Sequence, residues 1–299
     1  MKEVVLITGA NGSLAKQAIK SLEGDFQIKL LSRTPKLSNE YLWDLEKQYI
    51  DPNSLKDVTH IIHLAGASIS AKRWTAKRKQ EIFSSRINSA KLLLKQLSVS
   101  GQKISTFLSA SAVGYYGSSL NDSVFDESSP PGNDFLSNVC LEWEQTALSF
   151  ESLGFAEKSS ILRFGIILDH TSGALKSMSF PIKLGIGSPL GNGKQWVPWI
   201  HIDDASNAIK HVLKNRLRGV FNAVSGTHTN NEELTQAIAS SLNRKLHFPN
   251  IPEYLCKVIF GEMSGVVING SRVSSEKLKS NGYKFRYTDI NITLESLLG

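Results

Sequence analysis

The sequence has few cysteines and no long apolar run. Its 299 residues include two cysteines, Cys140 and Cys256, too few for a disulfide framework or a four-cysteine zinc site. No stretch approaches the roughly 20 apolar residues of a membrane-spanning helix, and the apolar segment near the start is too short for a signal peptide. We find no metal-ligand spacing of histidine, cysteine and carboxylate. These absences predict a cytoplasmic protein with neither a bound metal nor a membrane partner.

The composition is that of a folded, moderately basic protein. Hydrophobic residues make up 41% and charged residues 20%, which allows a sizeable core and excludes wholesale disorder. The net charge is +7, and five basic residues fall within residues 72–79. A cluster this local indicates an anionic ligand nearby or a solvated helix start, and both alternatives stay open. It does not predict a general nucleic-acid surface.

Apolar periodicity predicts alternating strands and helices. Strands are expected at 3–8, 27–31, 59–64, 104–109, 159–168, 196–202 and 220–224. Helices are expected at 13–22, 75–97, 134–150, 203–213 and 230–242, with a final one entered near 288–289. Strands separated by helices form βαβ units, so the sheet should be parallel and covered on both faces.

A glycine-rich turn follows the first predicted strand. The segment Thr8-Gly9-Ala10-Asn11-Gly12-Ser13-Leu14 lies where a strand gives way to a helix. Glycine permits a tight turn and a close backbone approach, and the helix start offers free N–H groups to a pyrophosphate. We therefore expect Gly9, Asn11, Gly12, Ser13 and Leu14 to contact a dinucleotide; a plain tight turn is the alternative.

The end of the second strand has no acidic residue. Where an NAD site carries a carboxylate for the ribose 2′-hydroxyl, this sequence has Ser32 and Arg33. An arginine fork and a hydroxyl can bind a 2′-phosphate that a carboxylate would repel. The sequence thus predicts NADP(H) as the cofactor, unless Arg33 is an ordinary exposed arginine.

Several further motifs carry a family resemblance. They include His63-Leu64-Ala65-Gly66-Ala67, Lys72-Arg73-Trp74, the segment from Ser109 to Gly117, Arg163-Phe164-Gly165, and Trp199-Ile200-His201 followed by two aspartates. Together with the glycine turn, they resemble the extended and atypical short-chain dehydrogenase/reductase superfamily. The sequence is most similar to its nucleoside-diphosphate-sugar epimerase-like branch, which has a C-terminal segment of unknown function.

The resemblance implies a fold and a division of the chain. We expect an α/β protein with a Rossmann-type doubly wound parallel sheet and a smaller C-terminal substrate lobe. Residues 1–168 would form the NADP-binding domain, with 196–242 returning to it. Residues 169–195 and 243–299 would form the substrate-binding lobe. The exposed helices of such sheets are where a homodimer would form.

The resemblance also implies further cofactor contacts. Leu64, Ala65 and Gly66 would run under the adenosine ribose and pyrophosphate. Glu81 and Arg86, on the long helix, would lie near the cofactor, where an arginine can meet a phosphate. Ser109 and Ile167 would border the nicotinamide half. Ordinary strand packing or an exposed helix face are the alternatives for these positions.

The expected catalytic pair is missing. Related enzymes use a Tyr-x-x-x-Lys pair to exchange a proton while a serine polarises the substrate. Ser111 is the better match for the serine, with Ser109 second, and Tyr116 is the candidate tyrosine, but no tyrosine in the chain has a lysine four residues later. The pair's two positions become Leu136 and Cys140, or Phe135 and Val139 in the other register. Asp134, Cys140 and His201 are candidate replacements; a core cysteine, a packed histidine and a helix cap at Asp203 or Asp204 are the plainer interpretations.

Two classes of function follow from these residues. The first is an NADP(H)-dependent oxidoreductase or sugar-nucleotide epimerase-like enzyme with a rearranged acid/base group. Its substrate would be a small molecule, either a sugar nucleotide or a carbonyl compound. The second is a non-catalytic NADP(H)-binding regulator that senses redox state. The serine favours the enzyme, and the missing pair favours the regulator.

Overall fold

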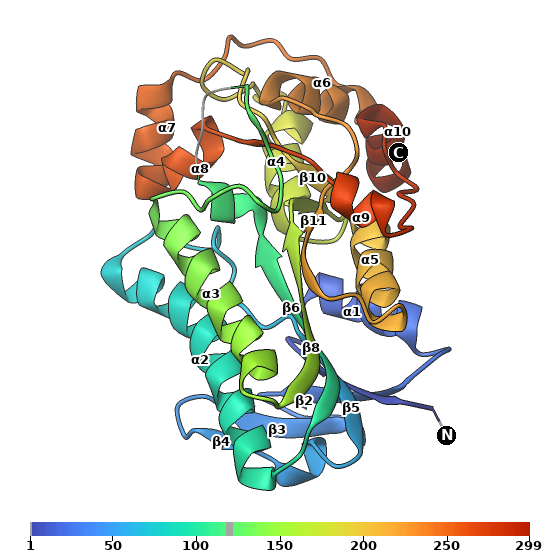
Figure 1. Ribbon diagram of the computed structural model, residues 1–299. Helices are drawn as coiled ribbons and strands as arrows, with labels where there is room; N and C mark the ends of the chain where they lie inside the picture. Colours follow the sequence, from blue (N-terminus) through green and yellow to red (C-terminus); the bar gives the residue numbers. More distant parts are fainter. Residues whose placement is uncertain (1, 118–121) are drawn as a thin grey trace.

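The computed structural model describes residues 2–117 and 122–299. Its centre is an eight-stranded sheet, with helices on both faces (Figure 1). The strands follow the order β11-β8-β6-β5-β1-β2-β3-β4, and all neighbours are parallel except β3 and β4. The predicted α/β class with a mostly parallel sheet is therefore confirmed.

The bounds of the sheet strands are close to those predicted at the centre of the sheet. They are β1 (Val4–Thr8), β2 (Gln27–Ser32), β3 (Glu40–Asp44), β4 (Tyr49–Ile50), β5 (Val58–His63), β6 (Ile104–Ala112), β8 (Ala156–Phe164) and β11 (Gly219–Ala223). β3 and β4 are not among the strands predicted from the sequence. These edge strands are short and partly exposed, so they lack the apolar run that marks a buried parallel strand.

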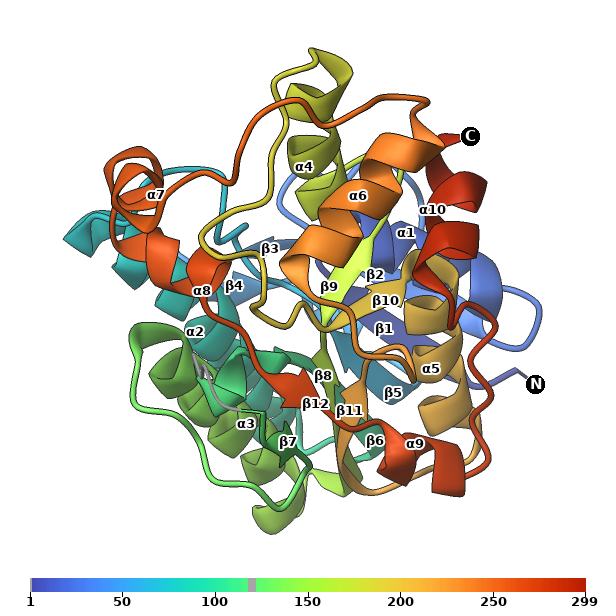
Figure 2. The same ribbon diagram turned by 90° about the horizontal axis from the view of Figure 1, so that it is seen from above.

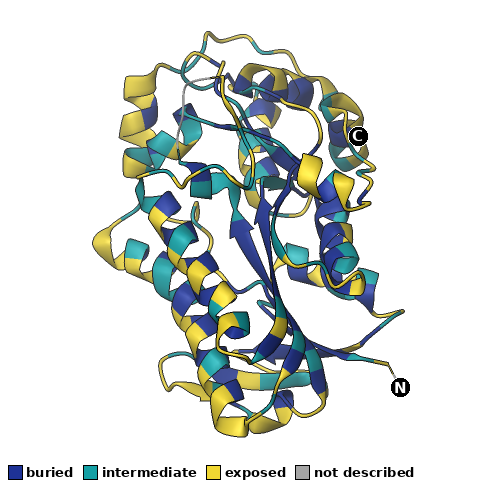
Figure 3. Cartoon of the chain, in the orientation of Figure 1, coloured by how far each residue is buried: buried dark blue, intermediate teal, exposed yellow. Residues whose placement is uncertain are grey.

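Helices cover the sheet in two pairs. On one face lie α1 (Ser13–Leu22) and α5 (Ile202–Lys214), and on the other lie α2 (Ala76–Ser100) and α3 (Phe135–Ser152) (Figure 2). Successive residues of a strand point to opposite faces. Accordingly Val5 shares an apolar cluster with Ala18 of α1, whereas Leu6 shares one with Phe150 of α3. This burial on both faces is visible as dark strands between helices with exposed outer sides (Figure 3).

The predicted strand at 159–168 is broken in two. It consists of β8 and β9 (Ile166–Leu168), separated at Gly165. A side chain at Gly165 would come within 2.6 Å of the Pro198 carbonyl oxygen, so the position requires glycine. β9 leaves the main sheet and pairs with β10 (Trp199–His201). After this bend, β9 and β10 form a separate two-stranded parallel sheet beyond the end of β8.

The remaining elements lie above the carboxyl ends of the strands. The helices are α4 (Gly173–Lys183), α6 (Asn231–Ser241), α7 (Glu253–Phe260), α8 (Ser264–Ile268), α9 (Glu276–Ser280) and α10 (Ile290–Leu298). The strands are β7 (Val124–Phe125) and β12 (Arg272–Val273), which pair in parallel. A capping box formed by Asn230 and Glu233 begins α6.

Candidate cofactor and active site

The glycine turn packs directly on the neighbouring strand. Gly9 has a φ of 71°, and a Cβ there would lie 2.7 Å from the Leu64 carbonyl oxygen. The Gly12 N–H donates to the Gly9 carbonyl oxygen at 2.8 Å, closing the turn. Thr8 Oγ1 accepts from the N–H groups of Leu64 and Ala65, both at 3.1 Å. These hydrogen bonds hold the carboxyl ends of β1 and β5 together next to the predicted cofactor site.

No side chain caps the N-terminus of α1. Gly12 is its N-cap and provides no side-chain cap, and the first turn holds no acidic residue. The first N–H groups of a helix have no partner within the helix, and they carry the positive end of its dipole. Asn11 is exposed, and Ser13 and Leu14 are partly exposed. Buried Ala15, in place of a third glycine, keeps α1 close to the sheet.

Arg86 lies beneath the segment that follows β5. Its Nη2 donates to the Ala67 carbonyl oxygen and its Nη1 to that of Ile82, both at 3.0 Å. A Cβ at Gly66 would lie 3.0 Å from the guanidinium carbon, so glycine makes room for it. Burial lowers the pKa of Arg86. Among the described residues it forms no ion pair with a carboxylate, which leaves a mostly buried cation beside the predicted pyrophosphate path.

The end of β2 carries Ser32 and Arg33 side by side. Ser32 is buried, and its Oγ accepts from the Thr34 N–H at 3.2 Å, whereas Arg33 is exposed. Glu81 lies nearby on α2. A hydrogen bond from Arg78 at 2.5 Å lowers its pKa, with Lys72 and Arg33 contributing further. Three cations therefore surround one exposed carboxylate at the outer end of the candidate site.

The basic segment 72–79 is largely occupied by contacts within the protein. Arg73 donates to the carbonyl oxygens of Val258 and Ile259 at the end of α7. Lys79 forms an ion pair with Glu262, and Arg78 donates to the carbonyl oxygen of Ser68. To the two alternatives for this cluster the structure therefore adds a third: the segment joins the start of α2 to the end of α7 and the residues after it.

Ser111 belongs to a buried polar network. Its Oγ donates to Glu144 Oε1 at 2.6 Å. Glu144 also receives a two-point hydrogen bond from Arg163, Nε at 2.8 Å and Nη2 at 2.7 Å. Both charged side chains are almost fully buried. Although burial lowers the pKa of Arg163, its contact with Glu144 raises it overall, so the guanidinium stays charged.

Tyr116 extends the network toward the C-terminal lobe. Its hydroxyl accepts from Arg163 Nη1 at 2.9 Å and donates to Asn222 Oδ1 at 2.7 Å. Asn222 Nδ2 in turn donates to the Ser274 carbonyl oxygen at 3.0 Å. Burial raises the pKa of Tyr116 to about 12. The Tyr115 ring, which is only partly buried, lies 3.4 Å from the Arg163 guanidinium.

Both registers of the missing pair place a buried residue at the position of the usual lysine. Val139 and Cys140 are both buried, and Leu136 and Cys140 face Gly114, at 3.6 Å and 3.9 Å from a Cβ built there. Burial, with Glu144 adding to it, raises the pKa of the Cys140 thiol to about 12. The Cys140 thiol is therefore a buried, neutral group.

The other predicted residues, Ser109, Ile167 and His201, make contacts with neighbouring residues of the protein. Ser109 is buried, and its hydroxyl donates to the Ala110 carbonyl oxygen at 2.9 Å. Ile167 is partly exposed and pairs with Ile200. His201 stacks on Tyr287, with 3.7 Å between ring centroids, and its Nδ1 accepts from the Asp203 N–H. His201, rather than Asp203 or Asp204, is therefore the N-cap of α5.

Comparison with known proteins decides the family. An epimerase family protein of Staphylococcus saprophyticus is 34% identical over 98% of both chains. The chain belongs to the NAD-dependent epimerase/dehydratase family. The model of that family matches residues 5–141, and a domain of unknown function, DUF1731, matches residues 251–297. This agrees with the predicted resemblance to an atypical extended short-chain dehydrogenase/reductase with an uncharacterised C-terminal segment.

Solved structures of related proteins cover the whole chain. The human epimerase family protein SDR39U1 (isoform 2), solved with NADPH, is 26% identical, covers 99% of each chain and has a TM-score of 0.87. A nucleoside-diphosphate sugar epimerase from Corynebacterium glutamicum is 25% identical with a TM-score of 0.80. That match covers all of this chain and 59% of the other. An Arabidopsis thaliana relative, named as chloroplastic, is 32% identical over 98% of this chain and 86% of its own.

Some residues of this candidate site are not predicted from the sequence. Arg163 stands out in the sequence only as part of a motif and Glu144 not at all, because a buried ion pair between a helix and a strand has no signature in one sequence. Asp169 was also missed. Burial raises its pKa, but hydrogen bonds from Thr171, Ser172 and Ser13 lower it overall, and the last of these places it beside the α1 N-terminus. Within residues 2–117 and 122–299, no cluster suited to a metal ion is found. No helix there is long and apolar enough to span a bilayer.

Proposed function

We propose that this protein is an NADP(H)-dependent oxidoreductase. The observation that carries the proposal is the uncapped N-terminus of α1, which follows a turn whose Gly9 has no room for a side chain. Arg33 without a neighbouring carboxylate on β2 favours the 2′-phosphorylated cofactor. The human relative solved with NADPH supports the same choice.

The cofactor would lie across the carboxyl ends of β1, β2, β5 and β6. Gly9, Ser13 and Leu14 would offer backbone N–H groups to its pyrophosphate, Gly12 would let the phosphates approach the backbone closely, and Asn11 would lie at the rim. Ser32 and Arg33 would hold the 2′-phosphate, and Glu81 and Arg86 would flank the adenosine half. Leu64, Ala65 and Gly66 would form the floor. Ser109 and Ile167 would border the nicotinamide. The substrate would enter from the lobe formed by residues 169–195 and 243–299.

The side chains available to exchange protons limit which reactions the protein can catalyse. A bound nicotinamide supplies or accepts hydride. The Ser111 proton is directed at Glu144, and the Tyr116 hydroxyl is held between Arg163 and Asn222. Leu136 cannot donate a proton, and neither residue of the usual pair is present. We therefore favour reduction of a carbonyl or quinone that takes its proton from solvent. Sugar-nucleotide epimerisation is less favoured, because it requires a group that removes and returns a hydroxyl proton.

A redox-responsive regulator is the second candidate. The observation that favours it is the continuous hydrogen-bonded path from Ser111, through Glu144, Arg163, Tyr116 and Asn222, to the backbone before α9. Binding at the nicotinamide end could then be transmitted to the C-terminal lobe without any reaction.

Calorimetric titration with NADPH, NADP⁺ and NADH tests the cofactor assignment. We expect Arg33→Ala to weaken NADPH binding about tenfold or more, as loss of a charged hydrogen bond does, and to leave NADH binding unchanged. Arg244→Ala, at an exposed arginine after α6, is the matched control. If none of the three nucleotides binds, both candidate functions are wrong.

Turnover separates the two candidates. An oxidoreductase should oxidise NADPH with some member of a panel of carbonyls and quinones. For any active substrate, Ser111→Ala should lower the rate; an unchanged rate would contradict a catalytic role for Ser111. Tight NADPH binding without turnover across the panel favours the regulator instead.

A further inference from the structure

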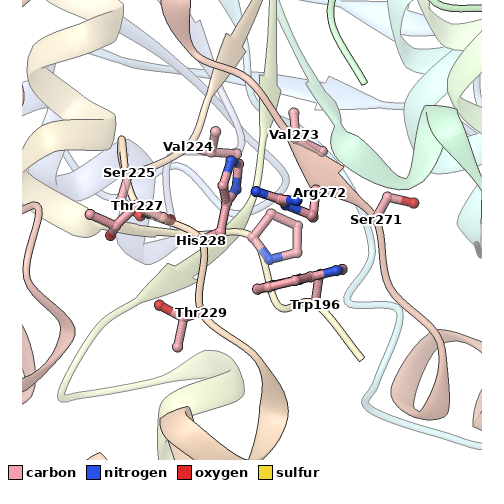
Figure 4. Close-up of a pocket in the computed structure, with 10 residues that line it drawn as sticks. Trp196, Val224, Ser225, Thr227, His228, Thr229, Ser271, Arg272 and Val273 are labelled. Carbon is pink, nitrogen blue, oxygen red and sulfur yellow. Dashed lines mark hydrogen bonds between the residues drawn. The ribbon is translucent and has the colours of Figure 1, made fainter. Parts of the chain in front are cut away.

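The polar side chains around β12 are closely packed. The Arg272 guanidinium lies on the Trp196 ring, 4.8 Å from its centre, and faces His228 (Figure 4). The space left between these side chains is about 10 Å³, no more than a single water molecule needs. Ser271 Oγ is turned away and donates to the Gly117 carbonyl oxygen at 2.9 Å. A charged group of a substrate therefore has no room here.

One face of α3 leads from the Ser111 network to an apolar position. Glu144, Cys140 and Leu136 follow one another at four-residue spacing, so they lie on the same side of the helix. Glu144 accepts from Ser111, and Cys140 is within hydrogen-bonding reach of the same serine. Leu136 comes next, 3.6 Å from a Cβ built on Gly114, and is partly exposed. A leucine therefore stands where one register places the usual tyrosine.

Two aromatic rings extend this apolar surface. The Phe135 ring packs edge-to-face on Trp74, with 5.1 Å between ring centroids. Trp74 Nε1 donates to the Ile69 carbonyl oxygen at 2.8 Å, which fixes the indole. Trp74 and Phe135 are partly exposed and pack on the same core cluster as the predicted cofactor floor. Trp74, Phe135 and Leu136, here called the apolar wall, therefore border both that floor and the end of β6.

The cations beside the apolar wall are already partnered. Lys79 Nζ lies 5.0 Å from the centre of the Phe135 ring and forms an ion pair with Glu262. The Arg163 guanidinium is held from two sides by the Glu144 carboxylate. A substrate diphosphate would have to displace these carboxylates. The surroundings therefore favour an uncharged ring over a sugar nucleotide.

The missing tyrosine selects among uncharged carbonyl compounds. Hydride addition to a ketone leaves an alkoxide about as basic as hydroxide, and water has a pKa of about 15.7, so an acid is needed nearby. A quinone instead leaves a phenolate like that of tyrosine, whose pKa is about 10. The quinone takes hydride from the nicotinamide, so a C–H bond breaks there and an O–H bond forms. Its other oxygen takes a proton from solvent, and the products are the hydroquinone and NADP⁺.

We propose that the apolar wall of Trp74, Phe135 and Leu136 binds the ring of a quinone substrate. The wall presents aromatic and aliphatic side chains to a flat ring, and the reaction of that ring needs no acid from the protein. This inference rests on the proposed function, because the wall lies beside the predicted nicotinamide position.

Equilibrium binding tests the site without turnover. NADP⁺ cannot donate hydride, so the protein saturated with NADP⁺ is titrated calorimetrically with 2-methyl-1,4-naphthoquinone. We expect saturable binding of this quinone, and none of cyclohexane-1,4-dione or UDP-glucose over the same concentrations. The saturated dione has the carbonyl groups without the aromatic ring, and UDP-glucose represents the sugar nucleotides.

Variants assign the binding to the apolar wall. Trp74→Ala should weaken quinone binding roughly three- to tenfold, as loss of an aromatic contact does, and Trp74→Phe should lose less. Trp196→Ala removes another partly exposed tryptophan, one whose ring Arg272 covers, and should bind the quinone as wild type does. An unchanged NADP⁺ affinity shows that each variant is folded.

Oxidation of NADPH by the same three compounds, corrected for the rate without protein, gives a second readout. We expect turnover of the quinone, with a raised KM in Trp74→Ala. Wild-type quinone affinity in Trp74→Ala, or preference for the dione or UDP-glucose, would overturn this inference while the cofactor assignment stands. So would NADPH binding with neither binding nor reduction of the quinone. Failure of both NADPH and NADP⁺ to bind would instead refute the proposed function, and this inference with it.

Discussion

Removing the charge of Glu144 should destabilise the protein far more than removing a neighbouring exposed charge. In Glu144→Gln, the buried Arg163 guanidinium loses the carboxylate that it contacts at 2.8 Å and 2.7 Å. Both side chains are less than one-tenth exposed, so water cannot replace the lost partner. Breaking a buried pair from one side costs about 3–5 kcal/mol. For a chain of this size, that corresponds to a Tm decrease on the order of 10 °C.

The same helix offers a matched control. Glu142 lies two residues before Glu144 on α3 and is exposed, so Glu142→Gln should change stability by less than about 0.5 kcal/mol. Urea unfolding followed by both fluorescence and circular dichroism measures the difference and tests whether the two lobes unfold together.

A double variant tests whether the lost stability comes from an uncompensated buried charge. Glu144→Leu combined with Arg163→Met removes both charges and should recover much of the lost stability, since apolar replacements of buried pairs are often neutral or stabilising. If Glu144→Gln is no less stable than Glu142→Gln, the pair is not the buried, charged unit described here. A double variant as unstable as Glu144→Gln would show that packing, rather than an uncompensated charge, determines the loss.

Two more changes test the cofactor turn and the core. Gly9→Ala would force a Cβ to within 2.7 Å of the Leu64 carbonyl oxygen at a φ of 71°. We expect it to cost about 1–3 kcal/mol and to weaken NADPH binding. Gly24→Ala, with open space around it, should do neither. Burial, and then Arg86, lowers the pKa of His63 to about 3 from 6.5. Its contribution to stability is therefore complete above pH 6.5 and lost as the pH falls toward 3, with a slope of up to about 1.4 kcal/mol per pH unit. Unfolding measured between pH 7 and pH 5 should be less pH-dependent in His63→Leu; equal slopes would contradict the burial of a neutral imidazole.

Local patterns were enough to predict the nucleotide-binding half. The strand–glycine–helix segment around Gly9 depends on neighbouring residues only, since backbone freedom and helix start are set within one turn. The alternation of apolar strands and amphipathic helices likewise predicts a parallel sheet covered on both faces. The short edge strands β3 and β4 were missed, because they are partly exposed and their residues alternate weakly.

The absence of the Tyr-x-x-x-Lys pair was also evident from the sequence, but its consequence was not. Only the fold brings Ser111 within 2.6 Å of a carboxylate 33 residues away. Only the fold seals Cys140 in the core, where burial raises the pKa of its thiol to about 12. Burial and long-range pairing depend on which elements pack together, and a single sequence carries no direct record of that.

The basic segment 72–79 shows most clearly which properties the sequence determines and which depend on the tertiary structure. The sequence by itself determined a cluster of positive charge, a turn that fits a pyrophosphate and a strand end suited to a 2′-phosphate. The tertiary structure decided that Arg73 and Lys79 contact the α7 region instead of a ligand. Charge and backbone freedom are properties of individual residues, whereas a binding partner is decided by the positions that folding gives to distant side chains.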